Sequence, residues 1–336
     1  MERREFLLKA GILASSIILG CSDVKEVDNM EIYEGEPKIN RGEPKVYVIK
    51  TDNRKEGIEE LLKYFRIEKF EGKTVAIKAN YNSDDPFPAS THPDALDAIS
   101  RELERVNAKA VLAERSGMGN TAAVLKNRGV FDILSRYGFS VIDLEGHKRW
   151  VRFEANHWKR GFLLADVFYE SDYVIQTCCL KTHRFGGHFT LSLKNSVGMV
   201  ARHAEGHDYM KELHTSEYQR YMIAEINIAY SPHVVILDAI QGFSKGGPES
   251  GETISPGVIL AGNDRIAVDA VGVAILRLFG TTPEVSKGPI FSQDQIKRAV
   301  QLGLGVSEPE EIEVIPANDD ATEICAEISS ELVKRS

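Results

Sequence analysis

The stretch YVIQTCCLKTHRFGGH, residues 173–188, decides the fold that we expect for this chain. It begins with an apolar, β-branched run that is typical of a buried strand, and it ends in a Gly-Gly turn flanked by basic side chains. In an open α/β sheet, the loops that leave the carboxyl ends of parallel strands form the ligand crevice. We therefore expect such a sheet, with the functional residues at the end of this strand.

Working outward, β-branched runs alternate with amphipathic helical patterns from residue 46 onward. We expect strands at 46–49, 74–78, 110–113, 140–142, 173–176, 234–237 and 258–261. Helices are expected at 56–65, 93–106, 127–137, 217–229 and 266–279, followed by a late helix at 292–302 and an edge strand at 312–315. This alternation predicts an α/β fold: a doubly wound, mainly parallel sheet with helices on both faces.

The N-terminus has the features of an export signal. Arg3-Arg4 followed by a short apolar region resembles a twin-arginine signal, and this region is too short to span a bilayer. Ile18-Leu19-Gly20-Cys21 resembles a lipoprotein processing box, in which Cys21 becomes the lipid-bearing residue. We expect residues 1–21 to be the signal, 22–45 a tether, and 46–336 a single α/β domain at the extracytoplasmic membrane surface. An uncleaved anchor or a chance basic start is the alternative.

Composition excludes several classes of protein. The 336 residues carry a net charge of −9 and show no basic stripe, which argues against nucleic-acid binding. The cysteines beyond the signal are Cys178, Cys179 and Cys325, too few for a disulfide scaffold and without a C-x-x-C pattern for zinc or an iron–sulfur cluster. Adjacent strand residues face opposite ways, so we expect Cys178 and Cys179 to be buried thiols rather than a redox pair.

Lys181 and His183 are the strongest candidates for a ligand site. Side chains alternate along a strand with a period of two, so these two should point to the same face and meet one ligand. Five of the nine histidines lie between His183 and His214, immediately after the strand. Chemistry is therefore expected to concentrate in this segment.

Lys194 and Asn195 follow Thr190, which could cap a short helix facing the Gly186-Gly187 turn. The N–H groups at such a helix start bind anions, and a nearby lysine would add charge. The functional interpretation is an anion or cofactor site. The alternative is a solvated lysine beside a structural glycine turn.

His203 and His207 are four residues apart, which on a helix would place both on one face as metal ligands. Gly206 lies between them and weakens the helical interpretation. A solvated histidine loop is therefore the alternative to a metal site.

Three further candidates lie near other expected strand ends. Asn80 follows the strand 74–78, and His92 precedes Pro93 at a helix start, where plain capping is the alternative. Asp238 ends the strand 234–237 beside a glycine-rich loop, a position that suits a metal ligand or general base. The alternative for Asp238 is that it organises the turn by accepting backbone N–H bonds.

At several of these residues the chain resembles the domain of unknown function 362 family, across about residues 46–280. The matching segments are Lys78-Ala79-Asn80, Thr91-His92-Pro93, Ala113-Glu114, Lys181-Thr182-His183, Leu193-Lys194-Asn195, the run from Val235 to Asp238 leading to Gly246-Gly247-Pro248-Glu249-Ser250-Gly251, and Asp264-Arg265-Ile266-Ala267-Val268-Asp269. The resemblance implies an association with ferredoxin-like iron–sulfur modules, although this chain lacks their cysteine clusters. It implies no settled activity.

A weaker resemblance runs to lactate racemase, whose nickel-containing cofactor is held by a lysine and histidines in an α/β domain. Lys194, flanked by His183 and His203, follows a broadly similar order. As an analogy, this resemblance suggests a chemistry without assigning one.

From these observations we expect a protein that binds a metal or metal-containing cofactor and a small anionic molecule at the strand-end crevice. The expected catalytic residues are His183, Lys194 and Asp238. The expected cofactor-binding residues are Lys181, Gly186, Gly187, Asn195, Asn80 and His92, and the expected metal ligands are His183, His203 and His207. The alternative is a non-catalytic accessory protein for electron transfer or cofactor maturation, with a redox partner protein at the membrane.

Overall fold

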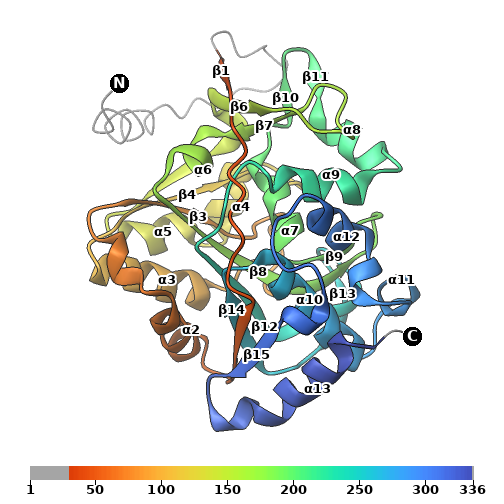
Figure 1. Ribbon diagram of the computed structural model, residues 1–336. Coiled ribbons are helices and arrows are strands. Elements are labelled where there is room, and N and C mark those ends of the chain that lie inside the picture. Colours follow the sequence, from red (N-terminus) through yellow and green to blue (C-terminus); the bar gives the residue numbers. More distant parts are fainter. Residues whose placement is uncertain (1–29, 335–336) are drawn as a thin grey trace.

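One large central sheet organises the molecule in the computed structural model, which describes residues 30–334 (Figure 1). Its main path runs in the order β15 (Glu313–Pro316), β2 (Lys45–Lys50), β14 (Val258–Gly262), β12 (Val234–Gly246), β8 (Tyr173–His183), β3 (Thr74–Lys78), β4 (Lys109–Glu114) and β5 (Ser140–Asp143). Along this path only β14 is antiparallel to its neighbours. Two further strands, β9 (His188–Thr190) and β13 (Gly251–Ile254), extend β8 and β12 as hairpins. The predicted mainly parallel sheet is confirmed, with β15 at its edge.

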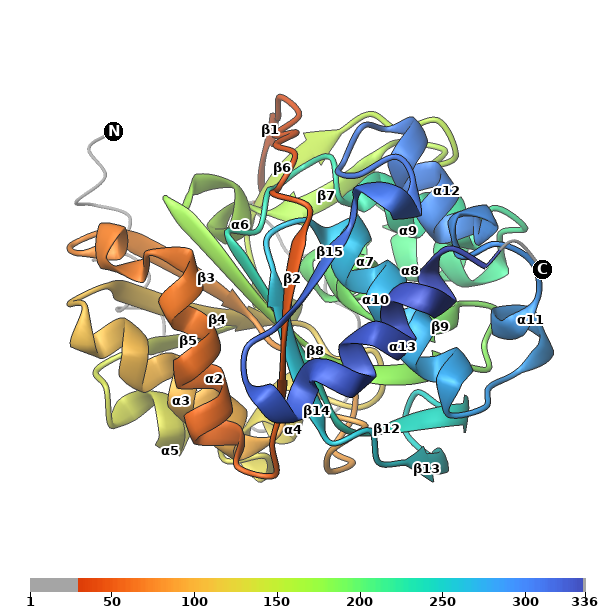
Figure 2. The same ribbon diagram turned by 60° about the horizontal axis from the view of Figure 1, so that its bottom comes forward.

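Helices cover both faces of the sheet, as Figure 2 shows with the sheet seen near its edge. One face carries α2 (Arg54–Leu62), α3 (Pro93–Arg105), α4 (Thr121–Asn127) and α5 (Val130–Ser135). The other carries α6 (Asp166–Glu170), α7 (Ser192–Asn195), α8 (Tyr209–Thr215), α9 (Gln219–Ile226), α10 (Arg265–Leu278), α11 (Pro283–Ser286), α12 (Asp294–Gln301) and α13 (Thr322–Leu332). Short 3-10 turns are η1 (Lys63–Phe65), η2 (Ile67–Phe70), η3 (Leu144–Gly146), η4 (Ser196–Met199), η5 (Ile290–Ser292), η6 (Pro309–Glu311) and η7 (Asp319–Ala321).

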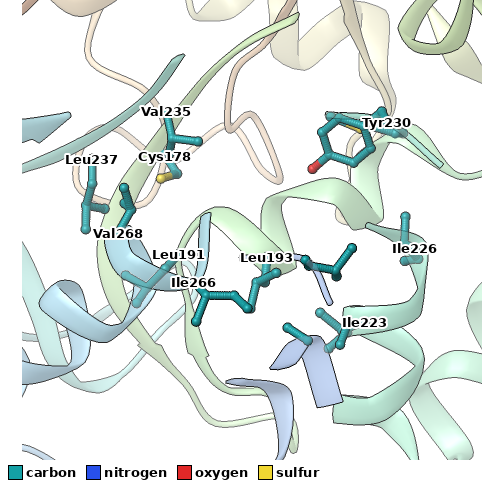
Figure 3. Close-up of a cluster of buried hydrophobic side chains, with 14 of the residues drawn as sticks. Cys178, Leu191, Leu193, Ile223, Ile226, Tyr230, Val235, Leu237, Ile266 and Val268 are labelled. Atoms are coloured by element: carbon teal, nitrogen blue, oxygen red, sulfur yellow. The ribbon is translucent and has the colours of Figure 1, made fainter. Parts of the chain in front are cut away.

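Alternation along the strands divides the core into two halves. In β12, Val234 and Ile236 pack in the core under α2 and α3, whereas Val235 and Leu237 pack in the core under α10. Figure 3 shows the second core, with Leu193 of α7 between Ile266 of α10 and Ile223 of α9. Helix α7 is thus anchored by apolar contacts on its core side.

Residues 30–44 contradict the predicted tether. Strand β1 (Glu31–Glu34) pairs in parallel with β6 (Arg149–Phe153), and β7 (Phe162–Ala165) completes a second, three-stranded sheet. The chain then stays on the domain surface, where Lys38 N donates to Ile228 O at 2.8 Å and Glu43 N to Asn263 Oδ1 at 2.8 Å. The folded domain therefore includes residue 30 onward.

The predicted signal with Cys21, and residues 22–29 of the predicted tether, lie outside the described residues. Within residues 30–334, no helix has the length and hydropathy needed to cross a bilayer.

Candidate functional site

A cavity of about 610 Å³ lies at the carboxyl ends of β3, β4 and β8. Helix α8 and the hairpin of β10 (His203–Ala204) and β11 (His207–Asp208) contribute its opposite wall. The cavity is lined by six of the residues that the sequence predicted for the site: Asn80, Lys181, His183, Lys194, Asn195 and His203. Three of them, Asn80, Lys181 and His183, had been predicted because ligands bind at the carboxyl ends of parallel strands.

Lys181 and His183 line the cavity from the same face of β8, as the alternation predicted. The Lys181 Nζ donates to Asn80 Oδ1 at 2.7 Å and to the Ala89 carbonyl, and burial lowers the Lys181 pKa to about 8. Burial, reinforced by the charge of Lys194, lowers the pKa of His183 far below its usual value. The His183 imidazole is therefore neutral at physiological pH.

Lys194 lies in α7 and is 7% exposed. Among the described residues its Nζ has no hydrogen-bond or ion-pair partner. Burial, together with the positive charges of Lys181 and Arg115, lowers the pKa of Lys194 to about 8. A buried ammonium without a counter-charge is costly, and an anionic ligand would supply one.

The side chains of Lys194 and His183 both pack closely against Gly187. A Cβ on Gly187 would lie 2.7 Å from Lys194 Cε and 3.0 Å from His183 Nδ1. Only a residue without a side chain leaves room for both groups. The predicted role of Gly187 in the site is therefore one of spacing.

Lys78 and Glu114 form a buried ion pair at the base of the cavity. They end neighbouring strands, and Lys78 Nζ lies 2.7 Å from Glu114 Oε2, with both side chains 2% exposed. Burial lowers the pKa of Lys78 and raises that of Glu114, so each group depends on the other to stay charged. The backbone N–H of Tyr81 also donates to Glu114 Oε2 at 3.1 Å, which favours the carboxylate form.

Asn195 connects this pair to the neighbouring strands. Its Oδ1 accepts hydrogen bonds from Asn80 Nδ2 at 3.1 Å and from Lys78 Nζ at 3.3 Å, and its Nδ2 donates to Thr177 O at 3.1 Å. Through these hydrogen bonds, Asn195 holds the side chains of Lys78 and Asn80 in place beside β8.

Two cavity-lining residues have a buried polar atom without a hydrogen-bond partner in the described part of the chain: His183 Nδ1 and Thr190 Oγ1. An unsatisfied buried polar group costs about 1–3 kcal/mol. Two such groups beside one cavity favour a ligand that would satisfy them.

The structure corrects the prediction of an anion site at the start of α7. Thr190 does not cap this helix, whose preceding residue is Leu191. The Asp269 carboxylate of α10 instead accepts from Ser192 N at 2.7 Å and from Leu193 N at 3.1 Å. A side chain of the protein thus occupies the position that the sequence suggested for a ligand.

The prediction that His203 and His207 share a helical face is wrong. These residues lie on opposite strands of a hairpin whose turn is formed by Glu205 and Gly206, with φ of 51° and 69°. His203 pairs with Asp208 and Ala204 with His207, so the two imidazoles project to opposite faces. His203 stays at the cavity rim, whereas His207 Nε2 lies 2.5 Å from Glu212 Oε2.

Asp238 and His92 lie outside the cavity lining, contrary to prediction. Asp238 accepts from Arg54 Nε at 2.8 Å and from Ile240 N at 3.2 Å, so it organises a buried turn. His92 Nδ1 accepts from Asp94 N at 3.1 Å and caps α3. For both residues the structural alternative is the correct one.

Gly186 forms the β8–β9 turn, where its φ of +77° favours glycine. Its carbonyl accepts from Arg220 Nη1 at 2.9 Å, and Arg220 Nη2 lies 2.6 Å from Asp294 Oδ2 of α12. This Arg220–Asp294 brace fixes the turn beside His183.

Sequence reasoning did not assign Arg115, although it directly follows β4 and lines the cavity. Its guanidinium donates to the carbonyls of Val200 and Val197 at 2.8 Å each, so it holds the segment after α7 while adding positive charge. Asn80 was predicted because it directly follows a strand, and the same reasoning applied to Arg115 after β4 would have identified it. His214, on α8, also lines the cavity and had been counted only as part of the histidine-rich segment.

Cys178 and Cys179 are both buried free thiols. Burial raises the pKa of Cys179 to about 12 and that of Cys178 well above its usual value. Both thiols are therefore protonated and unreactive.

Comparison with known proteins gives one family. A family model described as "Domain of unknown function (DUF362)" matches residues 75–274, a segment that includes the cavity lysines and His183. Among solved structures, the lactate racemase apoprotein from Thermoanaerobacterium thermosaccharolyticum is 17% identical, with a TM-score of 0.37 over 64% of this chain and 56% of that chain. The chain thus spans little more than half of that protein's length. No curated protein matches.

Proposed function

Because the chain belongs to the DUF362 family, whose description assigns no activity, we propose its function from the cavity: it binds a small anionic molecule against Lys194, and His183 transfers a proton to or from it. The observation that carries this proposal is the buried Lys194 ammonium without a partner in the described residues.

The charge balance of the cavity supports an anionic ligand. Lys181, Lys194 and Arg115 all line it, whereas the Glu114 carboxylate is already paired with Lys78. The positive charge is therefore in excess at the cavity floor. Attraction between an anion and these groups is stronger in a buried site than in water.

A bare metal ion does not fit the residues present. In the part of the chain that the structure describes, no three His, Cys, Asp or Glu side chains are placed to hold a metal ion. The cationic neighbours of His183 would also repel a divalent cation. A cofactor that suits this cavity is therefore anionic as a whole, and any metal in it would bring ligands of its own.

Proton transfer is assigned to His183 because its imidazole is neutral and its buried Nδ1 is unpartnered in residues 30–334. A neutral imidazole can accept a proton from a bound molecule and return it. A cavity with several convergent polar groups supports an enzyme over the alternative of an accessory protein. A position at the extracytoplasmic surface of the cell membrane is part of the proposal and rests on residues 1–21 alone.

The test is binding of inorganic phosphate and propionate, measured by calorimetry and by the rise in melting temperature. In Lys194→Ala the affinity should fall at least tenfold, while the melting temperature without ligand stays nearly unchanged. Lys245→Ala is the control, because Lys245 is exposed on β12 and pairs with Glu252 away from the cavity. Equal affinity of wild type and Lys194→Ala for these anions would overturn the proposal. It would also be overturned if neither phosphate nor propionate bound to the wild-type protein.

A further inference from the structure

We propose that Lys194 Nζ forms a covalent imine with the carbonyl carbon of a small 2-oxo acid bound in the cavity. This inference rests on the proposed function for recognition of the carboxylate. It goes beyond that function by naming the reacting atom and the class of substrate.

Four lysines line the cavity, of which Lys211 is exposed on α8. Among the three buried ones, the contacts single out Lys194. Lys78 is paired with Glu114, and Lys181 donates to Asn80 and Ala89. Acceptors of this kind stabilise an ammonium and occupy its protons. Of the three buried lysines, only Lys194 has no such acceptor among the described residues, so its amine is the buried one left available for attack.

Burial beside other cations is the usual way in which proteins activate a lysine as a nucleophile. Burial and the charges of Lys181 and Arg115 lower the pKa of Lys194 to about 8. An appreciable fraction of Lys194 is therefore a neutral amine near neutral pH, while the remainder carries the charge that attracts the anion.

His183 is placed to move the protons of this reaction. Lys194 Cε and His183 Nδ1 both pack against Gly187, where an added Cβ would lie within 3.0 Å of each. The imidazole is neutral, and its Nδ1 has no partner within residues 30–334. It can therefore accept a proton from the attacking nitrogen and donate it to the departing oxygen.

The step balances without any additional reactant. The neutral Lys194 amine attacks the carbonyl carbon, and the C–O π bond opens as the C–N bond forms. His183 carries one N–H proton to the oxygen left by the opened π bond, which gives a hydroxyl. It then carries the second N–H proton to that hydroxyl, which leaves as water while the nitrogen lone pair forms the C=N bond. The products are one imine and one water, and no atom is oxidised or reduced.

A 2-oxo acid suits the charges around Lys194. Its carboxylate is one bond from the reacting carbon, so the anion remains close to Lys181 and Arg115 as the imine forms. Thr190 Oγ1, buried without a partner in the described chain, can donate to one of its oxygens. A neutral ketone has no carboxylate to balance the positive charges of Lys181 and Arg115.

The experiment is reductive trapping. The full chain is incubated with pyruvate or glyoxylate and cyanoborohydride near pH 8, and the labelled lysine is identified by peptide mapping. We expect a single adduct at Lys194, protected by propionate and much weaker with acetone. Lys194→Arg keeps the cation and should keep propionate binding but lose the adduct, while Lys245→Ala should be labelled like wild type.

Labelling spread over exposed lysines, with none at Lys194, would overturn the imine. If propionate still bound in that case, the anion-binding function would stand by itself. Loss of both binding and labelling would overturn both proposals. Mapping of the wild-type protein decides the matter even if Lys194→Arg folds poorly.

Discussion

The Asp269 carboxylate accepts a 2.7 Å hydrogen bond from the backbone N–H of Ser192, and so a side chain of α10 fixes the start of the helix that carries Lys194. A second bond from Leu193 N, at 3.1 Å, completes the clamp. The position of the proposed nucleophile therefore depends on a buried group outside the cavity lining.

This clamp makes stability depend on pH. Burial raises the pKa of Asp269 from 3.8 to about 7, so the folded protein retains a proton that the unfolded chain releases. The free energy of unfolding should therefore fall as the pH rises from about 4 to about 7. Asp269→Asn cannot ionise, and its stability relative to wild type should rise across this interval by on the order of 4 kcal/mol. Urea unfolding at several pH values measures the difference, and a constant offset would contradict it.

The Lys78–Glu114 pair should be costly to break. Glu114→Gln leaves the Lys78 ammonium buried without a counter-charge, which typically costs about 3–5 kcal/mol. The matched control is Glu252→Gln, which breaks the exposed pair with Lys245 and should cost less than about 1 kcal/mol. If both substitutions lowered the free energy of unfolding equally in urea, the buried pair would contribute no more to stability than the exposed one.

The affinity of the protein for propionate should decrease as the pH rises from 7 to 9. With the pKa of Lys194 at about 8, the ammonium is lost as the pH rises through 8, and the dissociation constant for propionate should increase roughly tenfold between pH 7 and pH 9. An arginine stays charged across this range. Calorimetry on Lys194→Arg should therefore show a smaller decrease, and an unchanged pH profile would argue that Lys194 does not hold the anion.

Gly187→Ala should weaken ligand binding more than it weakens the fold. The new Cβ would displace the flexible end of Lys194 and crowd His183, so propionate affinity should fall about tenfold, equivalent to about 1.4 kcal/mol. Gly146→Ala is the control, since a Cβ there meets nothing within 4 Å. If the glycine variants bind alike, the close approach at Gly187 has no role in recognition.

The main sheet was predictable because its strands are apolar, β-branched runs. The run 234–237 is buried on both faces, and such a run indicates a central strand whatever its partners are. Strand β1, with the sequence EIYE, gives no such signal and is a strand only because β6, far along the chain, pairs with it. The boundary of the folded domain was therefore misplaced.

The site was predictable where position along a strand determines direction. Lys181 and His183 share a face by alternation, and both line the cavity. Asp238 also ends an apolar run, yet the buried partner Arg54, from a distant helix, makes it structural. Whether a polar side chain is available to a ligand depends on whether a residue distant in sequence forms a hydrogen bond or ion pair with it. Residue type and spacing along the chain do not show such partners.

The Arg220–Asp294 brace carries a consequence for relatives of this chain. Asp294 lies beyond residues 75–274, the segment matched by the family model, yet it holds the turn next to His183. A homologue with the same lysines and a different C-terminal portion would keep these cavity residues and lose this restraint on the β8–β9 turn. Divergence among such proteins can therefore change how firmly the turn beside His183 is held while the cavity lysines stay the same.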